Sequence, residues 1–238
     1  MTENSGSKKG KILVVDVGGT HIKILVTGEH EPREIPSGRK MTAGRAMREV
    51  KRLAGGWNYE VASIGYPGPV THGRPLREPF NLGGGWVGCD FRKAMGCPVK
   101  VINDAAMQAL GSYKGGRMLF LGLGTGLGSA MIVDGNVEPM ELAHLPYKKK
   151  TYEDYLGLRA LKKRGRKKWE ADVIRVVELL RDALVIEDVV LGGGNAKKVK
   201  KLPPHTRLGD NHNAFLGGFR LWESRGSHIA TGRNSECE

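Results

Sequence analysis

The chain has few cysteines, and none of them forms a recognisable pair. Its 238 residues include three cysteines, Cys89, Cys97 and Cys237, without a Cys-x-x-Cys motif. An odd number of scattered cysteines argues against a disulfide framework and gives no support to a cysteine-rich zinc site. The length is enough for one large domain or two modest ones with a true apolar core, so the fold does not need such cross-links.

Long apolar runs are missing as well. Residues 1–10 are polar and carry lysines, and no apolar segment follows them that could serve as the core of a signal peptide. No later stretch approaches the length of a membrane span. We therefore expect a cytoplasmic protein without a membrane partner.

Acidic residues are scarce relative to basic ones. The chain has 25 Asp and Glu against 38 Lys and Arg, a formal net charge of +13, and three basic runs occupy residues 148–150, 162–168 and 197–201. Taken singly, each run is more simply a solvated surface than a binding site. Three runs that converge beside a phosphate-handling site would instead suit a polyanion. Nucleic acid is not an expected partner, because the runs lack interleaved aromatic residues and the chain has no known nucleic-acid-binding module.

Apolar patterns in the first hundred residues predict an α/β unit in which a glycine turn, Gly18-Gly19, joins two strands. A last strand delivers Asn103 and Asp104 at its carboxyl end, the edge at which open α/β sheets bind ligands. The expected elements are strands at 11–17 and 21–27, a helix at 42–53, and strands at 61–66 and 99–102.

The same strand, glycine turn, strand pattern restarts in the second half, around residues 124–126. Its expected elements are strands at 118–123 and 127–133, a helix around 169–184, a strand at 188–191 and a helix near 213–222. Two such halves predict two α/β lobes with mixed sheets flanking a cleft, where ligands would bind. The expected boundaries are 10–105 for the first lobe, 106–224 for the second with its last helix near 211–224 at the lobe junction, and 225–238 for a frayed tail.

The first candidate site is the turn after Asp16. A carboxylate at a strand end is followed by Gly18, Gly19 and Thr20, so phosphate oxygens could reach backbone N–H groups while Asp16 holds Mg²⁺, usually through water. Alone, this motif is as well explained by an ordinary hairpin. A second copy at 122–128 weakens that alternative. The copy is neither a P-loop nor a dinucleotide-binding fingerprint, because the glycine spacing fails and a strand follows.

The second candidate site combines Asn103 and Asp104 with Glu141 and His144. These side chains supply the mixed donors and acceptors that a polyhydroxylated sugar requires, and a carboxylate beside a hydroxyl can act as a general base. Each has a simpler alternative: Asp104 could cap the following helix, and His144 could be a half-buried structural histidine or a metal ligand. No cysteine cluster follows His144 to complete a zinc site.

Together these motifs resemble the ROK family of sugar kinases, and within it the polyphosphate glucokinases. The resemblance extends from about Lys11 to Gly218. Its landmarks are DVGGTHIK (16–23), YPGPV (66–70), FNLGGGWVG (80–88), VINDA (101–105), GLGTGLGSA (122–130), ELAH (141–144) and LGGGNAKK (191–198). It implies the actin-like ATPase, or ribonuclease H-like, architecture.

The resemblance also implies a role for each matching residue. Asp104 matches the catalytic base, and the matching sugar contacts are Asn103, Glu141, His144 and, less directly, Asn81. The first phosphate motif comprises Gly18, Gly19, Thr20 and Lys23, the second Gly124, Thr125 and Gly126, and the nucleotide base and ribose would lie at Gly192, Gly193 and Gly194. The implied activity is transfer of a phosphoryl group from inorganic polyphosphate, ATP or both to the 6-hydroxyl of glucose or a related hexose such as mannose, with Mg²⁺. A homodimer is a further expectation, because dimers are frequent among such relatives.

Two departures qualify the resemblance. Residues 145–150 replace the cysteine-rich zinc loop of many ROK proteins, which favours the polyphosphate branch and predicts the loss of a second sugar-binding glutamate. Phe215 stands where relatives commonly have glycine, so we expect its ring to narrow an adenosine pocket. Two alternatives remain open: an ATP-only hexose or N-acetylhexosamine kinase, and a non-catalytic sugar-binding regulator. We do not expect the usual N-terminal helix-turn-helix of such regulators, because the predicted sheet begins by Lys11.

Overall fold

Two five-stranded sheets with the same strand arrangement form the frame of the protein. The computed structural model describes residues 10–210 and 212–223. One sheet has the order β3-β2-β1-β4-β7 and the other β10-β9-β8-β13-β14. In each, an antiparallel three-strand meander is extended by two parallel strands. The repeat inferred from the two glycine turns is therefore present in the fold.

The first sheet and its helices come from the first half of the chain. Its elements are β1 (Ile12–Val17), β2 (His21–Val26), β3 (Arg33–Pro36), α1 (Ala43–Leu53), β4 (Val61–Tyr66), β5 (Val70–Thr71), β6 (Arg74–Pro75), α2 (Phe91–Met95), β7 (Val99–Asn103) and α3 (Asp104–Ser112). The predicted strands and the helix at 42–53 lie within one or two residues of these bounds. The sequence patterns did not predict β3, α2 or the short β5–β6 hairpin.

The second half contains the other sheet and a group of helices. Its elements are β8 (Arg117–Leu123), β9 (Leu127–Val133), β10 (Asn136–Met140), η1 (Leu142–His144), β11 (Pro146–Tyr147), β12 (Lys150–Thr151), α4 (Tyr152–Leu156), α5 (Leu158–Arg164), α6 (Arg166–Leu184), β13 (Asp188–Gly192), η2 (Ala196–Lys198), β14 (Thr206–Leu208) and α7 (Asn213–Arg220). The predicted helix near 213–222 is α7. The expected tail at 225–238, and Cys237 within it, lie outside the described residues.

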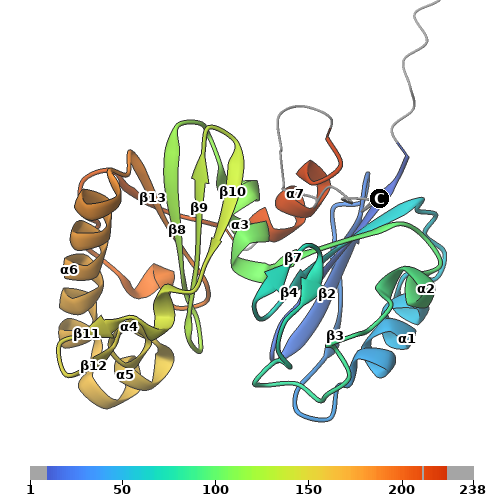
Figure 1. The fold of residues 1–238 in the computed structure, drawn as a ribbon, viewed down its shortest axis with the longest axis horizontal. Helices are drawn as coiled ribbons and strands as arrows, with labels where there is room; N and C mark the ends of the chain where they lie inside the picture. Colours follow the sequence, from blue (N-terminus) through green and yellow to red (C-terminus); the bar gives the residue numbers. More distant parts are fainter. Residues whose placement is uncertain (1–9, 211, 224–238) are drawn as a thin grey trace, which may run out of the picture.

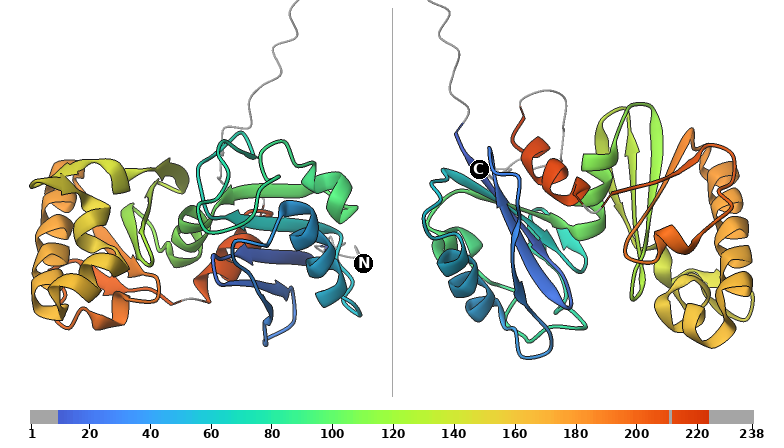
Figure 2. Two further views of the ribbon diagram at one scale, coloured as in Figure 1. Left: turned by 90° about the horizontal axis from the view of Figure 1, so that it is seen from below. Right: turned by 180° about the vertical axis from the view of Figure 1, so that it is seen from behind.

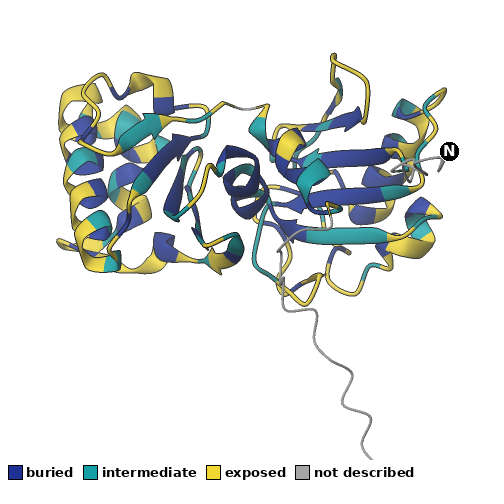
Figure 3. Ribbon diagram, turned by 90° about the horizontal axis from the view of Figure 1, so that it is seen from above, coloured by how far each residue is buried: buried dark blue, intermediate teal, exposed yellow. Residues whose placement is uncertain are grey.

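Alternating residues of the central strands enter different apolar cores, which explains the layered arrangement in Figures 1 and 2. In β1, Leu13 and Val15 pack with α1, whereas Val14 packs with α3 and α7. In β8, Leu119 packs with α6, whereas Phe120 faces α3. Strands that are buried on both faces read as continuous apolar runs, as these do. The sheets are accordingly the most buried part of the molecule (Figure 3).

Helices α3 and α7 fill the space between the two sheets (Figure 1). Although α7 comes from the end of the described chain, it packs against β1 and β4 of the first sheet. Trp222 follows it and donates from its indole nitrogen to Ser63 Oγ on β4, at 2.9 Å. Phe215 of α7 is buried in this central core and does not line the cavity described below, so the expectation that its ring narrows a ligand pocket is wrong.

None of the helices in the described residues combines the length and the apolarity that crossing a bilayer needs.

Candidate active site between the two sheets

The turn between β1 and β2 is held rigid from two sides. The Gly18 N–H donates to His21 O at 2.9 Å, and a Cβ on Gly18 would lie 2.7 Å from that oxygen, so the turn requires glycine. Ser37, just after β3, donates from Oγ to Gly18 O at 2.6 Å and from its N–H to Thr20 O at 2.8 Å. A Cβ on Gly19 would lie 3.1 Å from Asn81 Cβ, so the loop that carries Asn81 packs against the turn.

The turn between β8 and β9 is held by its own neighbours. The Gly124 carbonyl accepts from Leu158 N, at the start of α5, and from Asn195 Nδ2 at 3.2 Å. Gly193 has φ +78°, and a Cβ there would lie 2.8 Å from Leu123 backbone atoms. Gly193, just after β13, therefore packs directly against the second turn.

A cavity of about 580 Å³ brings most of the predicted site residues together. This is within the usual range of small-molecule sites. The predicted residues that line it are Gly19, Thr20, Asn81, Asn103, Asp104, Gly124, Thr125, Gly126, Glu141 and Gly193. The predicted residues outside its lining are Asp16, Gly18, Lys23, His144, Gly192 and Gly194.

Asp104 is the first residue of α3, but it is not the helix cap. Asn103 takes that position, with Oδ1 accepting from Ala106 N at 3.1 Å, while its Nδ2 donates to Gly68 O at 3.0 Å. The Asp104 carboxylate accepts from Ala105 N at 2.8 Å and otherwise faces the cavity. The simpler reading of Asp104 as a cap is therefore wrong, because the neighbouring asparagine does that work.

Burial raises the pKa of both aspartates at this site, and like charge adds to the rise for Asp104. Burial is the larger cause for Asp104, the negative charge of Asp16 is the next, and together they raise its pKa to about 7 against the opposing Ala105 N–H. Burial raises the pKa of Asp16 to about 6, partly offset by Lys23, which pairs with it across the β1–β2 ladder. Lys23 Nζ also lies 3.5 Å from Glu34 Oε2. The structure therefore places Lys23 between two carboxylates, and it does not line the cavity.

The arrangement suits a divalent cation that is shared with a phosphate substrate. A positive ion would favour the charged forms of these two half-buried carboxylates, whose pKa values are raised. Mg²⁺ is commonly held by one or two carboxylates plus substrate phosphates, without a full set of protein ligands. Within residues 10–210 and 212–223, no cluster of three His, Cys, Asp or Glu residues could hold a metal by itself.

Glu141 enters the cavity from the other lobe, just before η1. Buried Ser129 fixes this turn, because its Oγ donates to Met140 O at 2.9 Å and accepts from Leu142 N at 3.2 Å. Burial raises the pKa of Glu141, whereas the positive charges of His144 and Arg77 lower it. His144 is therefore close enough to act electrostatically, although it is exposed and lies outside the lining.

Among the lining residues that were not predicted, three have polar or charged side chains, Arg39, Gln108 and Glu153. Gln108 follows Asp104 by four residues, so helical spacing could have placed it on the same face of α3. Glu153 lies in the first turn of α4, and its Oε2 accepts from Leu127 N at 3.4 Å, beside the second turn. The cavity therefore contains two glutamates, Glu141 and Glu153, and the expected loss of a second sugar-binding glutamate stays a prediction.

Comparison with known proteins bears on this site. No known family model matches the chain. The chain is 29% identical over 214 residues to the polyphosphate glucokinase of Mycobacterium tuberculosis (strain ATCC 25177 / H37Ra), covering 82% of this chain and 77% of that protein. The resemblance to these proteins is confirmed.

Solved structures support the same fold. An inorganic polyphosphate/ATP-glucomannokinase from Arthrobacter sp. strain KM superposes with a TM-score of 0.75 at 24% identity, over 88% of this chain and 96% of that one. A ROK family glucokinase from Streptomyces griseus, solved with glucose and AMPPNP, gives 0.71 at 16% identity over 89% and 99%. A ROK family transcriptional regulator gives 0.67 at 17% identity over 89% and 77%. The fold is the actin-like ATPase fold of the ROK proteins, and it is shared by kinases and a regulator.

Proposed function

We propose that the protein is a sugar kinase that transfers a phosphoryl group from inorganic polyphosphate, ATP or both to the 6-hydroxyl of glucose or a closely related hexose such as mannose. The observation that carries the proposal is the position of Asp104. Its carboxylate has a raised pKa of about 7 and lines one cavity with both glycine turns, Glu141 and Asn81. A base with a pKa near the working pH is suited to accept a hydroxyl proton.

In the proposed reaction, the hexose lies against Asn103, Glu141 and His144, with Asn81 at its edge. Asp104 accepts the proton of the 6-hydroxyl as that oxygen attacks the terminal phosphorus. The bond between this phosphorus and the bridging oxygen of the donor breaks, and the donor leaves one phosphate shorter. A general base at such a position typically contributes about 10²–10⁴-fold to the rate.

The two glycine turns would hold the donor from both lobes. The Gly18 N–H is taken by His21 O, and the Gly124 N–H by Gly122 O and Gly126 O. The N–H groups of Gly19, Thr20, Thr125 and Gly126 would therefore bind the donor phosphates, and Lys23 adds positive charge beside Asp16. Mg²⁺ held near Asp16, usually through water, would spread the negative charge of the donor phosphates. When the donor is ATP, its base and ribose would lie at Gly192, Gly193 and Gly194. Closure of the two lobes would exclude water from the reacting groups.

Asp104→Asn tests the proposal directly. Purified protein with Mg²⁺ and glucose is supplied with ATP or long-chain polyphosphate, and glucose 6-phosphate is measured. The variant should bind glucose as the original protein does and lose turnover by about 10²-fold or more. Unchanged turnover would remove Asp104 from this role. If the original protein forms glucose 6-phosphate with ATP and not with polyphosphate, the alternative of an ATP-only kinase is the correct one.

A regulator without catalytic activity is the second candidate, because a transcriptional regulator shares the fold at a TM-score of 0.67. The base at Asp104, set between two phosphate-binding turns, favours catalysis over sensing. Glucose binding without product from either donor would select the regulator. We further expect a cytoplasmic protein that acts without nucleic acid or membrane, and that forms a homodimer, which sedimentation of the purified protein would detect.

A further inference from the structure

The three basic runs, which are far apart in the sequence, meet around the first half of α6. Two acidic residues of that helix, Glu170 and Asp172, bring them together, and both are buried. Asp172 forms ion pairs with Lys148 of the first run and Arg164 of the second. Residues 148–150, 162–168 and 197–201 are called here the α6 basic surface.

Glu170 attaches the third run to the second. Its Oε2 accepts from Arg166 at 2.9 Å, and its Oε1 accepts from the backbone N–H groups of Lys200 and Lys201. Bonds to the backbone fix the path of the third run and leave its lysine side chains free to face solvent. The two acids thus determine where the runs lie and neutralise little of their charge.

Most of the positive charge on the α6 basic surface stays unpaired. The three runs contain three, six and four basic residues. Among the described residues, salt bridges engage Lys148, Arg164 and Arg166, and the remaining basic side chains of the runs form none. All of those remaining residues are exposed. Close like charges of this number repel one another unless an anion lies between them.

The stability of α6 does not explain this placement. Its first turn contains Arg166, Lys167 and Lys168 and no acidic residue, and no side chain caps the helix at Gly165. The helix dipole favours acidic residues there and disfavours basic ones. A surface that only improved solubility would not need its charges at this unfavourable position.

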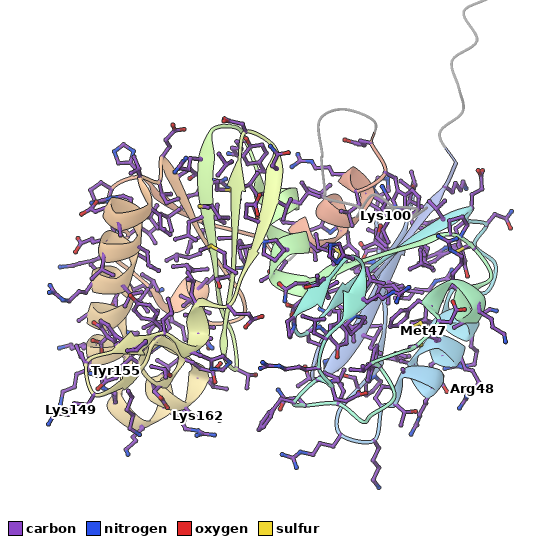
Figure 4. The ribbon with its side chains drawn as sticks, in the orientation of Figure 1. Met47, Arg48, Lys100, Lys149, Tyr155 and Lys162 are labelled. Carbon is purple, nitrogen blue, oxygen red and sulfur yellow. The ribbon has the colours of Figure 1, made fainter. Side chains whose placement is uncertain are left out.

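The α6 basic surface adjoins the cavity by two routes. On α4, Glu153 lines the cavity, while the Tyr155 ring lies 4.8 Å from the Arg164 guanidinium and 5.3 Å from Lys148 Nζ. At the other side, Lys198 Nζ donates to Asn195 Oδ1 at 2.8 Å, and Asn195 donates to Gly124 O. Figure 4 shows Tyr155, Lys149 and Lys162 at the same end of this lobe.

We propose that the α6 basic surface binds the part of an inorganic polyphosphate chain that extends out of the cavity past the second glycine turn. This inference rests on the proposed kinase function and adds a docking site outside the cavity. Polyphosphate carries about one negative charge per phosphate and has no bases to stack, so exposed lysines suffice to bind it. A single-stranded nucleic acid would require free aromatic faces, whereas Tyr155 is occupied by Lys148 and Arg164.

One variant removes a charge from each run, K149Q/K167Q/K200Q. These three lysines are exposed and form no salt bridge with described residues. The matched control, K51Q/K93Q/K114Q, removes the same charge from exposed lysines elsewhere. Binding of fluorescent long-chain polyphosphate is measured by anisotropy over a salt series. Glucose phosphorylation is measured with long-chain polyphosphate, tripolyphosphate and ATP.

The surface variant should bind long-chain polyphosphate about tenfold or more weakly than the control, and its logarithmic salt slope should flatten by about two. Its kcat/KM should fall with long-chain polyphosphate and stay at the control value with tripolyphosphate and ATP, which also shows that the variant is folded. Equal long-chain binding and equal rates in the two variants would overturn the proposal while leaving the kinase intact. Selective loss of binding without glucose phosphorylation by the original protein would support the surface and reject the kinase. If the surface variant instead binds single-stranded nucleic acid more weakly than the control and binds polyphosphate equally well, polyphosphate is the wrong ligand for this surface.

Discussion

The two glycine hairpins have the same frame and opposite electrostatic character. The two hairpins differ at the second residue pair from the turn. In the β1–β2 hairpin this pair is Asp16 and Lys23, whereas in the β8–β9 hairpin it is Gly122 and Gly128. The first hairpin thus carries charge into the site. The second presents backbone groups and Thr125, and no charged side chain.

The glycines of the second hairpin have a packing reason. A Cβ on Gly128 would lie 2.9 Å from Ala105 Cβ, in the first turn of α3. That close approach sets the position of α3 and therefore of Asp104. The two hairpins thus differ in role: the second fixes where Asp104 lies, and the first supplies a charge that adds to the effect of burial on the pKa of Asp104.

The largest expected loss of stability comes from forcing apart α3 and α7, the two helices between the sheets. In Gly217→Ala, the new Cβ on α7 would lie 1.8 Å from Met107 O of α3, so the two helices must move apart. Overpacking against backbone should cost about 3 kcal/mol of unfolding free energy, measured by chemical denaturation. Gly44→Ala in α1 is the control, because its new Cβ meets no atom closer than 3.6 Å, at Arg48. The control should gain about 0.5–1 kcal/mol. A cost below about 1 kcal/mol for Gly217→Ala would show that the lobes do not depend on this contact.

Local sequence signals predicted both hairpins and the position of Asp104. Apolar runs that end in glycines, and a polar pair at a strand end, are short-range patterns. The short edge strands β3 and β14 went unpredicted because they have only four and three residues, which is too few for a clear alternating pattern. Likewise, Glu153 reaches the cavity because α4 packs beside the second turn. The local sequence of α4 does not predict this contact.

The convergence of the basic runs could not be predicted either. It depends on Glu170 and Asp172, which fall off the apolar stripe of α6 and read as ordinary solvent-facing acids of an amphipathic helix. Their burial becomes evident once residues 147–148 and 200–201 are seen to cover them. A buried charge is explained by its partners, and these come from remote parts of the chain.

Removing the charge of the first hairpin should stabilise the protein in a pH-dependent way. The pKa of Asp16 is about 6 in the fold against the ordinary aspartate value of 3.8, so the folded state disfavours the charged form. The cost of Asp16 is absent below about pH 4, grows as pH rises through about 6, and is complete above it. Asp16→Asn should therefore raise the unfolding free energy by about 2 kcal/mol at pH 8, allowing for partial solvent screening. It should leave the value at pH 4 unchanged.

The same variant should also lower the pKa of Asp104, because the negative charge of Asp16 is one of its causes. Carboxyl NMR titration of the metal-free protein would measure this shift separately from any effect on Mg²⁺. Lys23→Gln is the matched control, since loss of the positive charge should raise the pKa of Asp16. An Asp104 pKa that does not respond to Asp16→Asn would mean that the two hairpins act independently.

The smallest effect should come from adding a single methyl group to the second hairpin. A Cβ on Gly124 meets no protein atom within 4 Å, whereas one on Gly19 in the first hairpin would press on Asn81 at 3.1 Å. Gly124→Ala should therefore leave stability unchanged, so any kinetic change reports the space that the donor needs. If donor phosphates approach the backbone N–H groups of the second hairpin, the donor KM of this variant should rise up to about tenfold. That rise is the equivalent of one weakened hydrogen bond. The KM for glucose should stay constant. An unchanged donor KM would place the phosphates against the first hairpin alone, and the two hairpins would then differ in function as well as in charge.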